Sequence, residues 1–257
     1  MTERRGEGTT SWGLASAKSS RPYGQRSAVA LLLENTHLTV PGAMRHPSTL
    51  PPGSHVEVVP GAFASLVVGA AYGSVAPRYV ESARHVDDGV SLITANCGFA
   101  IAYQSEVAAA VTAPVALSSL LLVPLLARVY RHRVGVLTYD ADQLDEARRR
   151  AAGWPGGFKP PILGMRDRAE WANLAEIATE SIDATRLGDE LISAMRPFCT
   201  DYELLAVLLE CTAMIPFRAR MREELGVAVF DMVGLVDFLL NRPVLGAFDA
   251  PTDSTGP

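Results

Sequence analysis

The chain has 257 residues, a formal net charge of −5 and a hydrophobic fraction of 48%. Such a length supports one large domain or two small ones, and it excludes a disulfide-stapled mini-protein, a collagen-like chain and a largely disordered chain. Because nucleic-acid-binding proteins usually carry a basic excess, the acidic balance also argues against a nucleic-acid partner.

The lysine and histidine content argues against two common kinds of cofactor. Only Lys18, in the N-terminal tail, and Lys159, in a Gly/Pro-rich connection, are lysines among the 23 basic residues. A pyridoxal-type enzyme needs a buried lysine for its Schiff base, and neither residue is well placed for that role. None of the five histidines pairs with another His, Cys or carboxylate at the spacing of metal ligands. We therefore expect neither an organic cofactor nor a metal ion.

From Ser27 onward, short apolar runs alternate with helical patterns. The predicted strands are Ala28–Leu33, His55–Val59, Val90–Ala95, Pro114–Leu117, Arg133–Thr138, Pro161–Gly164, Leu204–Leu209 and Val227–Phe230. The predicted helices lie near residues 76–87, 99–111, 119–131, 141–152, 168–179, 183–198, 213–225 and 232–240. Strands that are nearly continuous in Val, Ile, Leu and Ala are typical of sheets covered on both faces. The alternation therefore predicts a mostly parallel α/β architecture.

The ends of the chain and one apolar stretch differ from the α/β pattern of the rest. Residues 1–27, which lack an apolar signal core, and residues 249–257 are predicted to be flexible tails. Residues 107–127 form an uncharged stretch that is long enough for a membrane span. Because two prolines and a pair of serines divide that stretch, no single helix is expected to cross a membrane there.

Two segments 114 residues apart resemble each other. Ile93–Cys97 aligns with Val207–Cys211, and the helices that follow them align without a gap. Chance similarity between two ordinary βαβ units is the alternative explanation. The coincidence of Cys97 with Cys211 favours a true internal repeat.

This repeat predicts two pseudo-symmetric α/β lobes rather than one (β/α)8 barrel. The expected lobes are residues 28–131 and 132–231, each with a mostly parallel four-stranded sheet flanked by helices. Residues 232–248 are expected to contain a C-terminal helix that packs back on the first lobe. Ligands bind beyond the carboxyl ends of parallel strands, so we expect the active site in the cleft between the lobes.

Two of the three cysteines occupy equivalent positions in these lobes. Cys97 and Cys211 each end a predicted strand just before a helix, where unpaired amides favour a thiolate and can hold a carboxylate. Gly98 allows the backbone to approach a ligand, and Thr212 supplies a hydroxyl and an amide. Cys199 lacks this setting and is expected to be structural. An odd, small number of cysteines favours a reducing, cytoplasmic compartment.

Two thiols on opposite sides of a carbon atom suit proton transfer. One, as thiolate, removes the α-proton of a carboxylic acid, and the other, as thiol, protonates the opposite face. Backbone amides and hydroxyls would stabilise the intermediate enediolate. Cys97 and Cys211 are therefore the predicted catalytic residues of a racemase or epimerase that acts on a small carboxylate.

The cysteine motifs resemble those of a known family. Asn96-Cys97-Gly98-Phe99 and Glu210-Cys211-Thr212-Ala213 are similar to the motifs of the aspartate/glutamate/hydantoin racemase superfamily, as are Pro114–Ser119 and Gly135–Tyr139. The resemblance covers residues 28–240. It implies two pseudo-symmetric lobes with the active site between them, and cofactor-independent racemisation by the two cysteines.

The motifs also depart from the family pattern. Amino-acid racemases of the superfamily have Cys-Asn-Thr at the first motif, where Gly98 and Phe99 follow the cysteine here. Glutamate racemases have Cys-Thr-His at the second, where Ala213 replaces the histidine. The resemblance therefore supports the class of chemistry better than glutamate or aspartate as substrate. The superfamily also includes arylmalonate decarboxylases and maleate isomerases, and the retention of both cysteines favours a racemase over the one-cysteine decarboxylase pattern.

Several polar residues at predicted strand ends are candidate substrate ligands. In the superfamily the loop after the first strand contacts substrate, which nominates Asn35 and Thr36, with ordinary turn chemistry as the alternative. Ser118 and Ser119 end the fourth strand, where one is expected to bind a carboxylate and the other to cap the next helix. Thr138 ends the fifth strand and is expected to reach the cleft.

The residues that precede the two cysteines have different expected roles. Asn96 lies at an irregular strand end and joins Gly98 and Thr212 among the candidate substrate ligands. Glu210 is expected to point away from the cleft and to be structural, because successive side chains of a regular strand alternate.

Three functions remain open. The first is the two-thiol racemase or epimerase. The second is a lyase, decarboxylase or cis-trans isomerase of the same superfamily, with a nucleophilic or proton-donating cysteine. The third is a non-catalytic small-molecule binding protein. Homodimer formation is also left open by the sequence.

Overall fold

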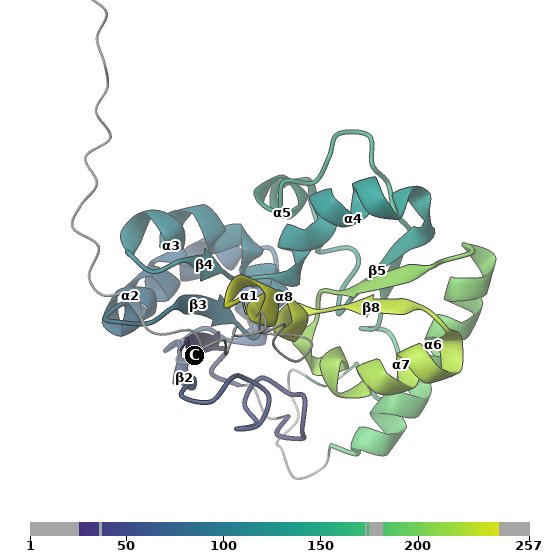
Figure 1. Ribbon diagram of the computed structural model, residues 1–257, viewed down its shortest axis with the longest axis horizontal. Coiled ribbons are helices and arrows are strands. Elements are labelled where there is room, and N and C mark those ends of the chain that lie inside the picture. Colours follow the sequence, from purple (N-terminus) through teal and green to yellow (C-terminus); the bar gives the residue numbers. More distant parts are fainter. Residues whose placement is uncertain (1–25, 36–37, 173, 175–181, 242–257) are drawn as a thin grey trace, which may run out of the picture.

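The computed structural model describes residues 26–35, 38–172, 174 and 182–241. Eight strands in these ranges form two four-stranded sheets, and all of their pairings are parallel. The sheets lie in two lobes, each flanked by helices (Figure 1). The predicted α/β class with two lobes is confirmed. The predicted tails lie outside the described ranges, apart from residues 26 and 27.

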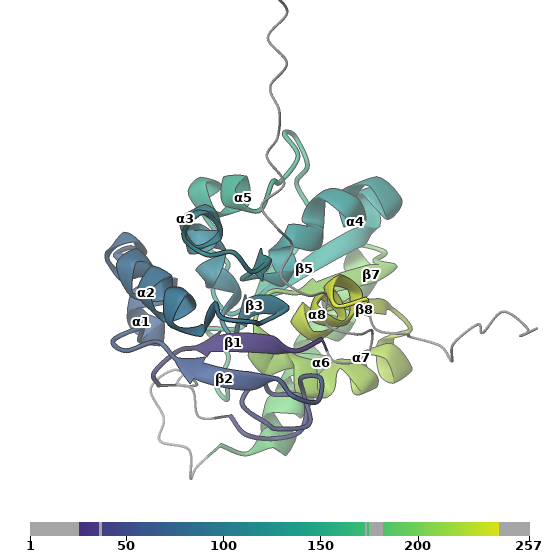
Figure 2. The same cartoon turned by 60° about the vertical axis from the view of Figure 1, so that its left-hand side comes forward.

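The first sheet has the strand order β2-β1-β3-β4. The central strands β1 (Ala28–Leu32) and β3 (Leu92–Ala95) are buried at every position. The edge strand β2 (His55–Val58) alternates polar and apolar residues and is largely exposed, and the other edge is the short β4 (Val115–Ala116). Figure 2 shows β1, β2 and β3 side by side. Continuous apolar runs therefore mark the strands that are covered on both faces.

The second sheet repeats this order as β6-β5-β7-β8. Its central strands, β5 (Val134–Thr138) and β7 (Ala206–Leu209), are again fully buried. The edge strands are β6 (Ile162–Gly164) and β8 (Ala228–Phe230), both partly buried. The two lobes thus have the same topology.

The internal repeat is also a repeat of strand register. Ile93 pairs with Val115 in the first sheet, and Val207 pairs with Val229 in the second. Both members of the second pair lie 114 residues after those of the first. Because the spacing holds for both strands of the pair, the sequence similarity reflects equivalent structure rather than chance.

Helices fill the connections and cover the sheets. The α-helices of the described residues are α1 (Ala64–Val68), α2 (Ala76–Val86), α3 (Gln104–Ala110), α4 (Val123–Val129), α5 (Glu146–Ala151), α6 (Ala184–Asp201), α7 (Arg218–Leu225) and α8 (Met232–Leu239). Shorter 3-10 helices are η1 (Tyr72–Val75), η2 (Gly98–Tyr103), η3 (Ser119–Leu122), η4 (Arg131–Arg133) and η6 (Thr212–Phe217). None of the helices in the described ranges has the length and apolar character needed to cross a bilayer.

Alternate residues of β1 face two different helices. Val29 and Leu31 belong to the apolar cluster that contains α2, whereas Ala30 and Leu32 belong to the cluster that contains Val236 of α8. The last helix therefore returns from the end of the second lobe to cover the open face of the first sheet. Figure 2 shows α8 beside β3.

The helices after the two cysteines start differently from the prediction. Instead of single helices over residues 99–111 and 213–225, η2 precedes α3 and η6 precedes α7. Pro216 lies inside η6, where a proline cannot donate a backbone hydrogen bond. Of the helix predicted at 168–179, residues 168–172 form turns and residues 173 and 175–179 lie outside the described ranges.

Asp231 anchors the returning helix α8. Its buried carboxylate accepts a hydrogen bond from the Gly234 amide at 2.8 Å and lies 3.3 Å from the Arg218 guanidinium. We predict that Asp231→Ala lowers the free energy of unfolding by about 1–3 kcal/mol, because a helix cap and a partner for Arg218 are both lost. Urea denaturation measures this change, and the exposed Glu223→Ala on α7 is the control. Equal stability of the two variants would contradict the anchoring role.

Candidate active site

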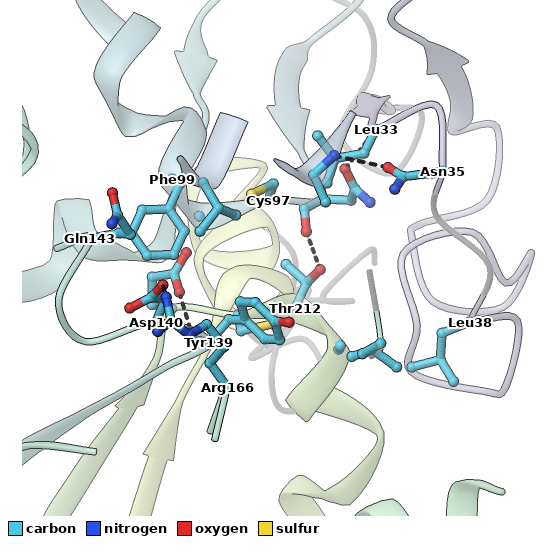
Figure 3. Close-up of a pocket in the computed structure, with 18 of the residues that line it drawn as sticks. Leu33, Asn35, Leu38, Cys97, Phe99, Tyr139, Asp140, Gln143, Arg166 and Thr212 are labelled. Atoms are coloured by element: carbon cyan, nitrogen blue, oxygen red, sulfur yellow. Dashed lines mark hydrogen bonds and ion pairs between the residues drawn. The ribbon is translucent and has the colours of Figure 1, made fainter. Parts of the chain in front are cut away.

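A cavity of about 300 Å³ lies between the lobes. Its walls come from segments that follow β1, β3, β5 and β7, which is where ligands bind in parallel sheets. Apolar side chains dominate the walls, among them Leu33, Leu38 and Phe99. Figure 3 shows Asn35 and Leu38 on one side of the cavity and Phe99 and Gln143 on the other. The volume suits a small organic molecule.

Cys97 and Cys211 both line this cavity and hold equivalent positions at its two sides. Each directly precedes a 3-10 helix with extended backbone dihedrals, φ −118° and ψ 118° for Cys97 and φ −79° and ψ 119° for Cys211. Their carbonyls accept hydrogen bonds from the amides of Ala100 at 3.0 Å and Met214 at 3.1 Å. Both thiols are free. The two cysteines therefore line one cavity, and their catalytic roles stay a prediction.

Burial outweighs the helix N-termini in setting the acidity of these thiols. Burial and the negative charge of Glu210 raise the pKa of Cys97 to about 12, although two amides of η2 and the charge of Arg148 act in the opposite direction. The same two causes raise the pKa of Cys211 well above its usual value. The amides at the helix starts do act to lower the pKa of each thiol, as expected, but burial and Glu210 outweigh them, so the net shift of both pKa values is upward and favours the neutral thiol.

Glu210 lines the cavity, which contradicts its predicted outward orientation. Strand β7 ends at Leu209, so the alternation of a regular strand no longer applies to the next residue. The Glu210 side chain is buried, and its Oε2 accepts hydrogen bonds from the Thr138 hydroxyl at 2.8 Å and the Tyr139 amide at 3.4 Å. Burial raises the pKa of Glu210 to about 7, despite these hydrogen bonds and the charge of Arg148.

Gly98 makes room for the Glu210 carboxyl. A Cβ atom on Gly98 would lie 2.4 Å from both the carbonyl oxygen and Oε1 of Glu210. Since real Cβ atoms do not approach other atoms so closely, the absence of a side chain at this position is required. The two cysteine segments thus meet across the cleft through the glycine that follows Cys97.

Hydrogen bonds between the lobes hold the two cysteine segments together. The Thr212 hydroxyl donates to the Asn96 carbonyl, and the Ser119 hydroxyl donates to the Leu209 carbonyl at 2.6 Å. The Asn96 side chain in turn accepts from the Leu33 amide at 2.9 Å. These bonds join the end of β3 to the end of β7 and to the loop after β1.

A buried arginine supports the same region from the second lobe. The Arg148 guanidinium donates to the carbonyls of Val67 and Val68, both at 2.9 Å, and lies over the rings of Tyr72 at 4.0 Å and Phe99 at 4.8 Å. No solvent reaches this side chain. Its charge therefore acts through a poorly screened medium on the nearby thiol and carboxyl groups.

The other predicted site residues fall into two groups. Asn35, Asn96, Gly98 and Thr212 line the cavity with the cysteines, and the Asn35 side chain accepts a hydrogen bond from the Ala64 amide at 2.9 Å. The residues that do not line it are Ser118, which caps η3, Ser119, which bonds to β7, and Thr138, which reaches only Glu210. Thr36 lies outside the described residues.

Sequence reasoning missed the charged mouth of the cavity. Arg166 and Asp140 form an ion pair of 2.6 Å there, and Gln143 lies close by. Asp140 follows β5 and Arg166 follows β6, so the rule that ligands meet the carboxyl ends of parallel strands points to both. Within the described ranges, no group of three or more His, Cys, Asp or Glu side chains could hold a metal ion.

The close approach of Gly98 to Glu210 gives a testable consequence. We predict that Gly98→Ala lowers the free energy of unfolding by about 1–3 kcal/mol, because the added methyl group meets backbone that cannot move freely. Thermal denaturation measures this loss. Gly73→Ala is the matched control, since a Cβ there would meet nothing within 4 Å. An unchanged melting temperature for Gly98→Ala would contradict the close contact.

Comparison with known sequences finds lyases among the relatives. No family model matches the chain. It is 32% identical over 177 residues to dimethylsulfoniopropionate lyase 5 of Emiliania huxleyi, which covers 62% of this chain and 35% of that protein. A dimethylsulfoniopropionate lyase of Durusdinium sp. clade D is 23% identical over 212 residues, 78% of this chain and 69% of that protein. The chain thus spans between one third and about two thirds of these relatives.

Comparison with solved structures finds two-lobed enzymes. Allantoin racemase of Pseudomonas fluorescens has a TM-score of 0.61 at 18% identity over 83% of this chain and 89% of that one. Allantoin racemase of Klebsiella pneumoniae has a TM-score of 0.53 at 16% identity over 83% and 86%. Unliganded arylmalonate decarboxylase has a TM-score of 0.50 at 15% identity over 86% and 94%. The chain therefore shares its fold with these racemases and with the decarboxylase.

Proposed function

We propose that this protein is a lyase that removes the α-proton of a small carboxylate with a cysteine thiolate and then expels a leaving group from the β-carbon. The observation that carries this proposal is the position of Cys97 and Cys211, which line one small cavity from equivalent corners of the two lobes. A carbon acid held between them has a base within reach on one face and a proton donor on the other.

Dimethylsulfoniopropionate is the proposed substrate. Five sequence relatives carry the name dimethylsulfoniopropionate lyase. The one from Emiliania huxleyi described above is 32% identical to this chain over the aligned residues. The substrate is a propionate that bears a dimethylsulfonium group. When its α-proton is removed, the electron pair forms a carbon–carbon double bond, the bond to sulfur breaks, and acrylate, dimethyl sulfide and one proton result.

The cavity supports such a substrate by its size and its walls. A volume of about 300 Å³ admits a molecule with few heavy atoms. The aromatic rings of Phe99 and Tyr139 line it, and rings of this kind attract sulfonium and ammonium cations through their negative faces. The half-exposed Arg166 guanidinium at the mouth is paired with Asp140, but a guanidinium has five N–H donors, so we propose it as a second contact of the substrate carboxylate.

Racemisation or epimerisation is the second candidate. The near-equivalence of the two cysteine corners favours it, because inversion at a carbon needs a base on one face and an acid on the other. In that case the substrate would carry a stereocentre next to its carboxylate. The products separate the two candidates, since elimination releases a fragment and racemisation does not.

We predict that the purified protein releases dimethyl sulfide from dimethylsulfoniopropionate. Cys97→Ser and Cys211→Ser should each reduce the turnover by at least about 10²-fold, because a hydroxyl is a much weaker acid than a thiol and leaves no base. Headspace gas chromatography of dimethyl sulfide and proton NMR of acrylate measure the reaction. Cys199→Ser is the matched control and should keep full turnover, because Cys199 packs in the core of the second lobe.

Full turnover by the Cys97→Ser protein would overturn the thiol mechanism. If the protein cleaves no dimethylsulfoniopropionate, the same samples are tested with chiral amino acids, hydantoins and malonates in deuterated water. Uptake of deuterium at the α-carbon without fragment release would identify the racemase. Binding without exchange or cleavage would identify the binding protein.

A further inference from the structure

A third ionisable group, Glu210, shares the cavity with the two thiols. Its side chain is 1% exposed, and its carboxyl lies against Gly98, directly after Cys97, while its backbone directly precedes Cys211. We infer that Glu210 accepts the proton of the thiol that acts as the base and then passes this proton to solvent. This inference rests on the proposed lyase, whose reaction must release one proton per turnover.

The thiols need such a partner because neither ionises by itself. Burial raises the pKa of both cysteines, so both carry a proton at neutral pH. The negative charge of Glu210 contributes to that rise in both cases. When the proton moves from a thiol to Glu210, the opposing charge disappears as the thiolate forms. The cleft then keeps a single negative charge, whereas ionisation of a thiol beside a charged Glu210 would create two.

The hydrogen bonds of Glu210 leave one oxygen available. Oε2 accepts hydrogen bonds from the Thr138 hydroxyl and the Tyr139 amide, and the Phe99 amide of η2 also favours the charged carboxylate. Oε1 is buried and has no hydrogen-bond partner of normal geometry among the described residues. Oε1 is also the oxygen that would collide with a side chain at position 98. A buried oxygen without a hydrogen bond lowers the stability of the fold, so its presence calls for an explanation such as a function. Here it lies in the wall of the cavity, between the segments that carry the thiols.

The charged surroundings match a group that changes its protonation near neutral pH. The groups that act on Glu210 are Cys97 at the start of η2, Cys211 at the start of η6 and the Arg148 guanidinium of α5. Asp140 and Arg166 form a mutually neutralising pair at the mouth. With a pKa of about 7, Glu210 both takes up and releases a proton readily at physiological pH.

The resulting cycle balances in atoms and charge. At rest both thiols are protonated and Glu210 is a carboxylate. A thiol proton moves to Glu210, and the thiolate removes the α-proton of the substrate as the carbon–sulfur bond breaks, which restores the thiol. Glu210 then loses its proton to solvent, and this is the proton that accompanies acrylate and dimethyl sulfide. A racemase returns every proton to its product and needs no such export.

The first test is the pH profile of kcat/KM for the wild-type protein and for Glu210→Gln, which keeps the shape and removes the charge. In the wild type, kcat/KM should fall as the pH drops through about 7, because a protonated Glu210 accepts nothing. Glu210→Gln should lose on the order of 10²-fold at pH 8 and should also lose this acidic limb. The control Glu81→Gln, exposed on α2, should behave as the wild type.

The second test needs no turnover and therefore stands if the proposed lyase activity fails. In a Cys199→Ser background, iodoacetamide alkylation of Cys97 and Cys211 is followed separately by mass spectrometry of their peptides. In the wild type the alkylation rate should rise with pH and level off above about 7, where ionised Glu210 opposes further thiolate formation, whereas in Glu210→Gln the rate should rise steadily with pH. Infrared difference spectra should show a protonated carboxyl that appears as the pH falls through about 7 and is missing in Glu210→Gln.

The outcomes separate the alternatives. A wild-type acidic limb that persists in Glu210→Gln, or an unchanged pH dependence of alkylation, would overturn the role of Glu210. Uniformly reduced turnover with an unchanged pH profile would identify a purely structural residue. A levelling of the alkylation rate that is lost in Glu210→Gln, together with no cleavage of dimethylsulfoniopropionate, would reject the proposed substrate and would keep the coupling between Glu210 and the thiols.

Discussion

The burial of two thiols and one carboxyl group in a single small cleft is the constraint on which this protein depends. Each group is disfavoured in its charged form by desolvation, and each negative charge disfavours the others. The groups therefore favour their neutral forms, and a negative charge on one of them makes ionisation of the others harder. In the proposed mechanism a proton moves from a thiol to the carboxyl before the thiolate acts.

The fold creates this constraint through its symmetry. Two parallel sheets of the same order direct the carboxyl ends of β3 and β7 toward each other. Each end is continued by a 3-10 helix whose first residue follows a cysteine. Hydrogen bonds between the lobes, from Thr212 and Ser119 to backbone carbonyls, then hold the corners together. The symmetry breaks beside the cysteines, since Glu210 in the second lobe occupies the space that a side chain on Gly98 of the first lobe would fill.

The strands could be predicted from the sequence because each one is marked by a run of neighbouring residues. The central strands β1, β3, β5 and β7 are buried at every position and are marked by short, mostly apolar runs. The candidate site was predicted in part. Residues beside the cysteines line the cavity. Ser118 and Ser119, which follow β4, do not line it: Ser118 caps η3, and Ser119 bonds to the backbone of the other lobe. The prediction that Glu210 points away from the cleft fails because it extends the side-chain alternation of a regular strand one residue past the end of β7.

The amino-acid sequence by itself determined the class of fold, the internal repeat of 114 residues and the two cysteines that end equivalent strands, because periodicity and spacing are properties of neighbouring residues. Only the tertiary structure decided the acidity of the thiols and the direction of Glu210. Both depend on how much solvent and which charges surround a group, and much of those surroundings comes from segments more than 50 residues away in the chain, such as Arg148 for Cys97 and Thr138 for Glu210.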